Sequence, residues 1–180
     1  MSDIVPARTI IQVEEARYPA ATSESFASRV GSSINHIMTY QYDHKGWVLN
    51  GIYGRSTAAQ VSVDGALPIF RDMNIMGIFM FNSVAGLSGT TEIDIKRFTA
   101  SGGSGTSIFS VRPSITSAAG NNAYLMSWLN PAETLENPAG TTLPTFSVTQ
   151  LNKGDALTLD FVSRQLMAES LTVALAVRPR

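Results

Sequence analysis

From residue 46 onward, apolar and polar residues alternate along short runs that are separated by turn-forming residues. In the run 91–96, Ile93 and Ile95 fall on one face of an extended segment, and charged residues occupy the other face. Alternation with a period of two is typical of a β-strand that buries one face. The same pattern occurs at 60–63, 145–149 and 157–161.

Further runs rich in β-branched and aromatic residues lie at 75–81, 106–110, 123–128 and 171–177. Together the runs predict about eight short strands, joined by loops rich in Gly, Ser, Asn and Pro. About eight strands are typical of a double-sheet jelly roll. The sequence therefore predicts a mainly β chain in which residues 46–180 form a single jelly-roll-like antiparallel β-sandwich.

Two of the runs are uncharged on both faces. Simple alternation in 75–81 places Ile75, Phe79 and Phe81 on one face and Met76, Ile78 and Met80 on the other. In 171–177, small uncharged residues lie opposite the larger apolar set. A strand face that meets water normally carries charges, so a second cover is expected, either other parts of this chain or a neighbouring subunit. The candidate subunit interface comprises Met76, Ile78, Met80, Thr172, Ala174 and Ala176.

Residues 1–45 have a different pattern. Pro6 and Pro19 flank the β-prone run 9–13, which predicts an extended arm rather than part of a compact core. Apolar residues at helical spacing predict a short helix over 22–38, and the stretch 34–42 also fits a strand. The arm is too short for a core of its own, so its apolar residues are candidates for attachment to something else. They are Ile4, Val5, Ile10, Ile11 and Val13.

Composition excludes several classes of partner. Charged residues make up only 15% of the chain, its net charge is −1, and no basic cluster is present, so nucleic acid is not an expected partner. The longest apolar stretch, 75–81, is far shorter than the roughly 20 residues that a membrane-spanning helix needs. The N-terminus has no signal-peptide pattern. With no cysteine, disulfides and Cys-ligated metals are excluded.

The sequence offers few groups for catalysis. The two histidines, His36 and His44, do not lie beside a recognisable nucleophile motif, and they make a weak metal signal, so we expect no enzyme activity, no metal and no cofactor. The glycine-rich run 102–107 lacks the Gly-Lys-Ser/Thr ending of a phosphate-binding loop and is expected to be a hairpin loop. An aromatic group could either bind a sugar face or plug the end of the sandwich. It comprises Tyr40, Tyr42, Trp47 and Tyr53.

A longer pattern resembles virion proteins of tailed bacteriophages. Residues 89–96 read Gly-Thr-Thr-Glu-Ile-Asp-Ile-Lys, and after a loop residues 106–115 read Thr-Ser-Ile-Phe-Ser-Val-Arg-Pro-Ser-Ile. In those proteins an x-I-D-V-K strand leads through a turn to T-S-I-F and R-P-T-I. Residues 151–160 and 171–177 are similar to the closing strands of the same domains. This sequence departs from the pattern by lengthening the turn to Phe98–Gly105.

The resemblance implies a jelly roll, commonly a homotrimer, in a head-decoration protein, head fibre or tail appendage, with no catalytic residue carried over. Together with the arm, it favours a non-enzymatic capsid decoration (cement) protein that binds and stabilises the assembled phage head. Its partners would be its own copies and the major capsid protein or another virion protein. It would be made in the host cytoplasm and would reside on the virion, at the head surface. The alternative is a receptor- or glycan-binding head of a tail or head fibre, which would bind a host glycan.

Overall fold

The structure is a computed structural model that describes residues 43–131 and 136–180. The compact unit that contains these residues begins at Tyr42. The expected arm, the short helix at 22–38 and the candidate attachment residues Ile4, Val5, Ile10, Ile11 and Val13 therefore lie outside the described residues. The first described strand begins at Asp43, so residues 43–45, expected in the arm, are part of a strand of the β domain.

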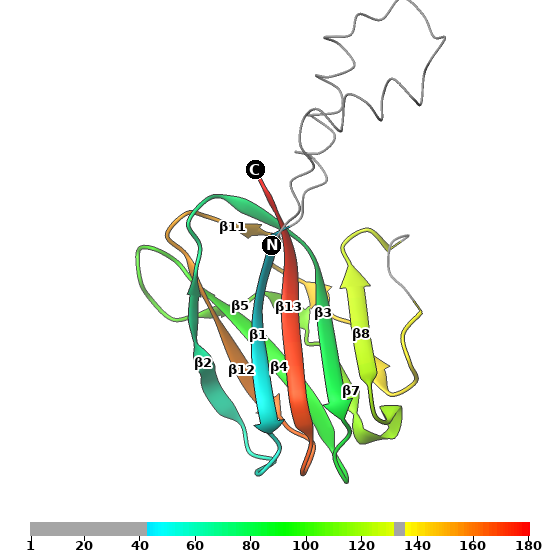
Figure 1. The fold of residues 1–180 in the computed structure, drawn as a ribbon. Helices are drawn as coiled ribbons and strands as arrows, with labels where there is room; N and C mark the ends of the chain where they lie inside the picture. Colours follow the sequence, from blue (N-terminus) through cyan, green and yellow to red (C-terminus); the bar gives the residue numbers. More distant parts are fainter. Residues whose placement is uncertain (1–42, 132–135) are drawn as a thin grey trace, which may run out of the picture. The chain divides into compact units, whose positions relative to one another are not determined.

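The described residues form short and long strands joined by turns (Figure 1). They are β1 (Asp43–Ile52), β2 (Gln60–Pro68), β3 (Met73–Val84), β4 (Thr90–Phe98), β5 (Thr106–Ser107), β6 (Phe109–Val111), β7 (Ser114–Thr116), β8 (Ala123–Trp128), β9 (Thr141–Thr142), β10 (Thr145–Phe146), β11 (Gln150–Leu151), β12 (Ala156–Ser163) and β13 (Glu169–Pro179), with a 3-10 turn, η1 (Ser117–Ala119), between β7 and β8. Along the described ranges, no helix is long and apolar enough to cross a membrane.

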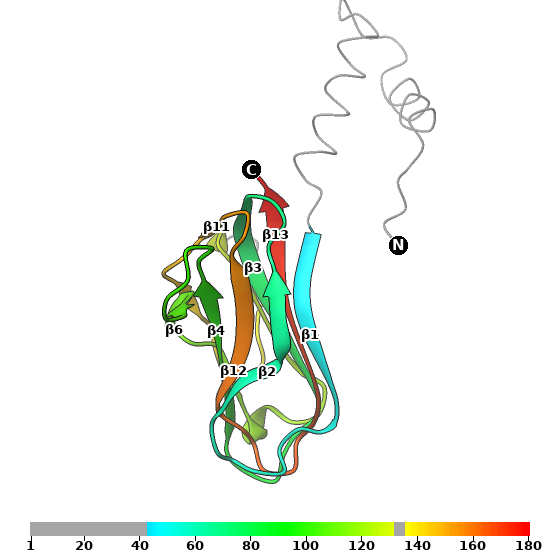
Figure 2. The ribbon, with the colours of Figure 1, turned by 90° about the vertical axis from the view of Figure 1, so that its left-hand side faces the viewer.

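The strands form two main sheets that pack face to face (Figure 2). One sheet has the order β1-β13-β3, and β3 pairs on its far side with both β8 and β11. The other has the order β2-β12-β4-β7-β9, and β5 also pairs with β4. Successive strands from β1 to β4 alternate between the two sheets, and β12 and β13 return to lie between the early strands. This antiparallel arrangement is a jelly roll, which confirms the expected fold class.

The core consists of the inward-facing residues of both sheets. Ile93 and Ile95 of β4 and Leu157 and Leu159 of β12 are all fully buried, as their alternation predicts. In the other sheet, β13 contributes Leu171, Val173, Leu175 and Val177, which are also fully buried. Burying each of these side chains stabilises the fold by roughly 1.5–3 kcal/mol, so the two inner faces hold the sheets together. The loop 99–105 joins β4 to β5, which pair antiparallel, so the glycine-rich run is a hairpin loop as expected.

A β-bulge in β3 changes the expected assignment of its faces. Consecutive residues Ala176 and Val177 of β13 pair with Gly77 and Ile75, so Met76 is an extra residue in β3. One extra residue exchanges the two faces for the rest of a strand. Ile78 and Met80 consequently point into the core, where they are 2% and 0% exposed. The expected common face of Met76, Ile78 and Met80 is therefore wrong, and the outer face of β3 is formed by Phe79 and Phe81 instead.

Candidate functional site

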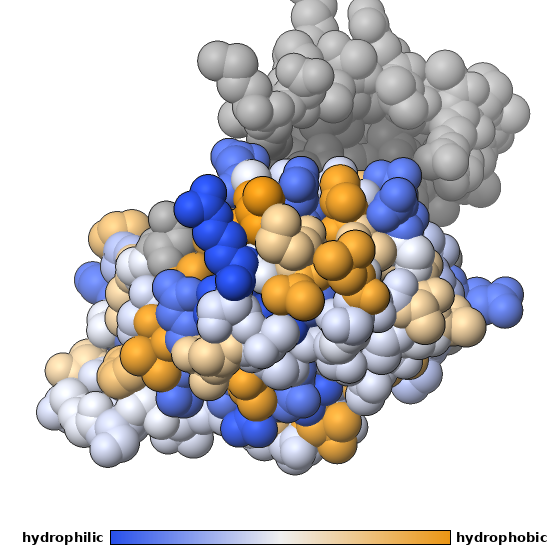
Figure 3. Space-filling model, turned by 90° about the horizontal axis from the view of Figure 1, so that it is seen from below, coloured by the Kyte–Doolittle hydropathy of each residue, from blue (hydrophilic) through white to orange (hydrophobic). Residues whose placement is uncertain are grey.

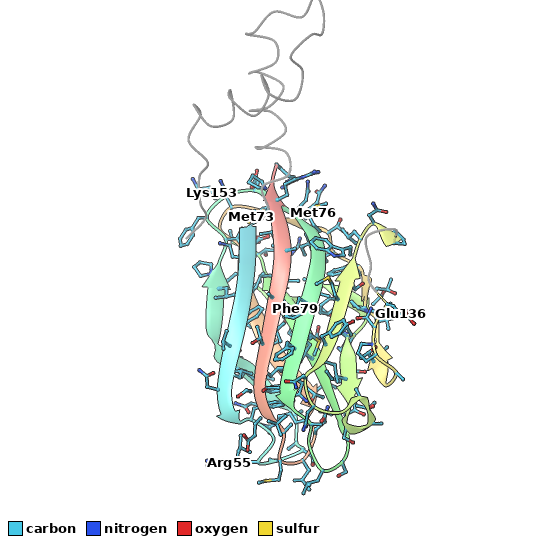
Figure 4. All side chains as sticks on the ribbon, turned by 45° about the vertical axis from the view of Figure 1, so that its right-hand side comes forward. Arg55, Met73, Met76, Phe79, Glu136 and Lys153 are labelled. Carbon is cyan, nitrogen blue, oxygen red and sulfur yellow. The ribbon has the colours of Figure 1, made fainter. Side chains whose placement is uncertain are left out.

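The outer face of the β1-β13-β3-β8 sheet has a central area without charged side chains, bordered at one end by Arg178 on the outward side of β13. Two rows of side chains run across the strands at matched register. One contains Gly46, Ala174, Phe79 and Met126, and the next contains Val48, Thr172, Phe81 and Tyr124. Ala176, Gly77 and Trp128 form a third row beside them. We call these three rows the apolar face; Figure 4 shows Phe79 near the middle of it.

Aromatic rings stand next to small residues on the apolar face. The Phe79 and Phe81 rings are stacked, with centroids 6.4 Å apart. At Gly77, a Cβ atom would lie only 2.9 Å from Cε3 of Trp128, so the indole lies directly over the glycine backbone. The adjacent β13 offers only Thr172, Ala174 and Ala176 at this surface, so raised rings border a shallow strip of small residues. Because the strip residues are small, the surface of a second protein can approach the β13 backbone closely there.

The two side edges of this sheet differ. At the β8 edge, Asn137 closes the strand: its Oδ1 accepts a hydrogen bond from the Met126 amide at 2.7 Å, and its Nδ2 donates to the Met126 carbonyl at 3.1 Å. In the described part of the chain, β1 pairs with β13 alone.

The outer face of the opposite sheet carries charges, and they are paired. Asp94 and Asp160 lie directly opposite each other on β4 and β12. Lys96 Nζ is 2.7 Å from Asp160 Oδ2, and Arg112 Nε is 3.1 Å from Asp94 Oδ2. Ser107 Oγ also donates to Asp94 Oδ1 at 2.5 Å. Each carboxylate thus has its own cation, which offsets the repulsion between two neighbouring negative charges.

These outward carboxylates are buried, although alternation alone predicts solvated positions. Asp94 is 2% exposed and Asp160 is 5% exposed. The segment around Ser107 covers Asp94, and the bulged part of β2 covers Asp160, whose Oδ1 accepts a hydrogen bond from the Ser62 amide at 2.7 Å. Because their oxygens are engaged in this way, the pair does not present a free acid and base. No group of residues suited to a metal ion is found within the described ranges.

The aromatic group predicted near the junction is only partly described. Trp47 and Tyr53 are both buried in the core, at 2% and 9% exposure. Tyr53 stacks on Phe161, with ring centroids 5.5 Å apart. Both rings therefore pack in the core, as expected for a plug, and Tyr53 also lines a surface pocket. Tyr40 and Tyr42 lie outside the described residues.

The hydroxyl of Tyr53 is enclosed in the core. It lies 3.0 Å from Thr91 Oγ1 and 3.1 Å from the Asn82 side-chain amide. Burial raises the pKa of Tyr53 from 10.0 to about 12, because the phenolate would lose its hydration; the hydrogen bond with Thr91 acts in the opposite direction. The unfolded chain therefore releases this proton before the folded chain does.

We expect the free energy of unfolding to fall by roughly 2–3 kcal/mol between about pH 10 and pH 12 on account of Tyr53. Below pH 10 the hydroxyl is protonated in both states, so the full stability is present there. Denaturant unfolding from pH 9 to pH 12 measures the effect, and Tyr53→Phe should remove this part of the decline. Tyr124→Phe is the matched control, because that hydroxyl lies outside the core and bonds the Glu136 carbonyl. Equal slopes for Tyr53→Phe and the unmodified chain would contradict the prediction.

Loops at the far end of the sandwich from Asp43 form a partly apolar surface (Figure 3). The Leu87 amide donates to the Leu166 carbonyl and the Met167 amide to the Gly54 carbonyl, both at 2.8 Å. Leu87 is nevertheless 80% exposed and Met167 is 44% exposed. Backbone hydrogen bonds thus fix the loops while their apolar side chains face outward.

The predicted site residues are divided by the structure. Thr172, Ala174 and Ala176 share the apolar face, as expected for the outer side of β13. Ile78 and Met80 are core residues and are not available to a partner. Phe79, Phe81 and Trp128 are members of the apolar face that the sequence analysis did not assign to it. The bulge at Met76 places Phe79 and Phe81 on this face, and Trp128 joins them from β8.

Comparisons with known proteins identify no family for the chain. No family model matches it, and no curated protein matches its sequence. Among solved structures, a CocE/NonD family hydrolase from Staphylococcus aureus is similar at 8% identity over 78% of this chain, with a TM-score of 0.35. The structure of infectious bursal disease virus, Gt strain, is similar at 11% identity over 77% of this chain, with a TM-score of 0.27. The similar region spans only 35% and 33% of those two chains. Similarity this weak does not indicate a function.

Proposed function

We propose that the chain is a non-enzymatic structural protein of a bacteriophage virion, and specifically a capsid decoration protein that binds and stabilises the assembled head. The observation that carries the proposal is the apolar face, which lacks charged side chains while the opposite sheet carries paired ones. The resemblance of 89–115 to phage virion proteins supports the same setting. A jelly-roll fold is compatible with many functions, so the proposal is based on the surface of the domain.

The apolar face is suited to contact between copies of the chain. Monomeric proteins rarely leave a contiguous uncharged sheet face open to water. Its aromatic residues match the residue types enriched in the centres of protein interfaces. A homotrimer held through Phe79, Phe81, Thr172, Ala174 and Ala176 replaces the earlier candidate interface, because Ile78 and Met80 are internal.

Attachment to the particle is assigned to the arm. Its apolar residues Ile4, Val5, Ile10, Ile11 and Val13 occur in a Pro-interrupted segment that cannot form its own core. An extended arm can add a strand to a sheet edge of the major capsid protein or another virion protein. Because the arm would bind only to the assembled head, each bound copy would add to the stability of that head, and many copies would add more.

Deleting residues 1–20 tests this assignment. We expect the truncated chain to keep its β content by circular dichroism, because every described strand lies after residue 42. It should no longer co-sediment with particles that lack the protein, whereas the full chain should bind and raise their resistance to heat. Undiminished binding by the truncated chain would place attachment in the β domain. Absence of binding by the full chain would contradict the decoration role itself.

A second function, recognition of a glycan, is favoured by one specific observation. A pocket lies between β1 and β2, and its lining contains guanidinium and amide groups but no carboxylate. A receptor-binding head requires such a site, whereas a purely cementing domain does not. The two functions are compatible in one chain, because the pocket and the apolar face use different side chains apart from Val48.

A further inference from the structure

The pocket lies where the two sheets part at the side formed by their edge strands. It has a volume of about 390 Å³ and opens to solvent, and this size is within the range of ligand sites in proteins. Both edge strands and the end of β12 contribute to it. The lining comprises Val48, Leu49, Asn50, Ile52, Tyr53, Arg55, Gln60, Val63, Phe161 and Arg164.

A bulge in each edge strand shapes the pocket. In β1, Leu49 and Ile52 pair with Leu171 and Glu169, so Asn50 and Gly51 are set against a single residue of β13. Gly51 has a φ of 72°, a conformation that favours glycine. The extra residue in β1 turns this part of the strand away from a regular ladder, and bulges of this kind often re-aim side chains beside binding sites.

The bulge in β2 lies across the pocket from the one in β1. Val63 and Gln60 pair with Leu159 and Phe161, so Val61 and Ser62 are set against Asp160 alone. Ser62 has a φ of 50°, which non-glycine residues seldom adopt. The Asp160 carboxylate holds the Ser62 amide at 2.7 Å and thereby fixes the bulge. The pocket is thus formed by two β-bulges in paired strands rather than by loops alone.

One cation of the pocket is held in a single position. Arg164 donates to the Ala58 carbonyl through Nε at 3.1 Å and through Nη2 at 2.8 Å. Its Nη1 donates to the Tyr53 carbonyl at 3.2 Å and to Gln60 Oε1 at 2.9 Å. The guanidinium also lies over the Phe161 ring, 5.4 Å from its centroid. All these partners are neutral, so the positive charge of Arg164 is fixed but not neutralised by them.

The remaining polar groups are mostly hydrogen-bond donors. Arg55 is exposed at the rim and adds a second positive charge. Gln60 uses its Oε1 to accept from Arg164, which leaves its amide nitrogen as the group for a ligand. Asn50 adds an exposed amide, and Val48 and Ile52 supply an apolar wall. The pocket therefore combines positive charge, amide groups and an apolar surface without any acid in its lining.

We propose that this pocket binds a carboxylate-bearing sugar, a uronate unit of an acidic glycan. The exposed Arg55 guanidinium matches a carboxylate, and Arg164 adds its positive charge and one remaining N–H. The amides of Asn50 and Gln60 match hydroxyl groups, and the apolar wall matches the C–H face of a sugar ring. A neutral sugar would leave the positive charge without a partner. Inorganic phosphate would satisfy the charge but leave the amides and the apolar wall unused. The inference rests on the second proposed function, glycan recognition, and does not depend on the decoration role.

Ligand-observed NMR with the full chain tests the proposal. The probes are a glucuronate-containing disaccharide, the matching neutral glucose disaccharide and inorganic phosphate. We expect saturation transfer to the uronate disaccharide at millimolar concentration, with binding at least about fivefold weaker for the neutral sugar, because it lacks the charged hydrogen bonds. Binding of the acidic sugar should weaken as salt is added. Equal binding of both disaccharides, or no transfer to either, would overturn the proposal.

Matched variants locate the site. Arg55→Gln removes an exposed positive charge at the pocket rim and should weaken uronate binding by about threefold to tenfold. Lys153→Gln makes the same change of charge at the opposite end of the domain and should have no effect (Figure 4). Equal weakening by both variants would indicate attraction to net charge only. Complete displacement of the sugar by equimolar phosphate would indicate an unspecific anion site. Either result would overturn the assignment of a uronate pocket.

Discussion

Replacing Ile78 with glutamate should prevent the domain from folding, whereas replacing its neighbour Phe79 with glutamate should leave it folded but monomeric. Ile78 is 2% exposed in the core, so a carboxylate there would be buried without a partner. Such a charge costs on the order of 5 kcal/mol or more, which is comparable with the whole stability of a domain. Circular dichroism and thermal unfolding would measure the loss.

Phe79 lies on the apolar face and should tolerate a carboxylate in the isolated domain, because water can reach it there. In the proposed homotrimer the same carboxylate would be buried at the contact, so analytical ultracentrifugation should show a monomer. Phe70→Glu is the matched control, because Phe70 is 75% exposed and lies outside the apolar face. A folded Ile78→Glu variant would contradict the bulge in β3. A monodisperse monomer for the unmodified chain at micromolar concentrations would end the trimer proposal.

Replacing Gly54 with alanine should destabilise the domain by about 3 kcal/mol and lower its melting temperature by roughly 10 °C. A Cβ atom at Gly54 would overlap the Gln165 carbonyl oxygen and lie 2.7 Å from the Ala168 amide nitrogen. These are backbone atoms, which cannot rotate away as a side chain can. The hydrogen bonds of Gly54 with Ala168 and Met167 would be stretched at the same time.

The control for Gly54→Ala is Gly102→Ala, in the loop between β4 and β5. A Cβ atom there meets nothing within 4 Å, and its φ of 82° makes alanine unfavourable by about 1 kcal/mol. Calorimetry of both variants should therefore show a loss about three times larger for Gly54→Ala. Similar losses of stability for the two variants would mean that the loops around Gly54 and Gln165 can move apart to accommodate a Cβ atom without a loss of free energy. Uronate binding by Gly54→Ala should also weaken, because Gly54 adjoins Tyr53 and Arg55 of the pocket.

The jelly-roll architecture was predictable because several strands have one apolar and one polar face. In 91–96 and 157–161 the alternation assigns Ile93, Leu157 and Leu159 to the core without any knowledge of their partners. In β3 both faces are apolar, so alternation contains no signal for a bulge. An extra residue at Met76 then exchanges the two faces, which makes the predicted interface wrong at Ile78 and Met80.

The first strand and the pocket illustrate a second limit. The sequence analysis predicts no strand over Asp43–Ile52, although Trp47 is buried within it. Asn50-Gly51 has the composition of a turn. The dipeptide is instead a bulge inside β1. The pocket depends on this bulge and on another in β2, whose partner strand β12 is distant in sequence. Such sites result from tertiary pairing and leave no local pattern for sequence analysis to detect.

The direction of β1 determines how the domain responds to mechanical tension. The chain enters the domain at Asp43, at the end of the sandwich where the C-terminus also lies, and β1 then runs toward the pocket (Figure 1). Force applied between Asp43 and the residues that line the pocket would act along β1 and load its ladder with β13, from Asp43 to Leu49, in shear. In shear, all the hydrogen bonds of the ladder bear the force together. When a strand is peeled from one end, the force acts on one hydrogen bond at a time and the bonds break one after another. Force applied between Asp43 and Arg180 would instead peel β1 away from β13, so the same strand resists force strongly in one direction and weakly in the other.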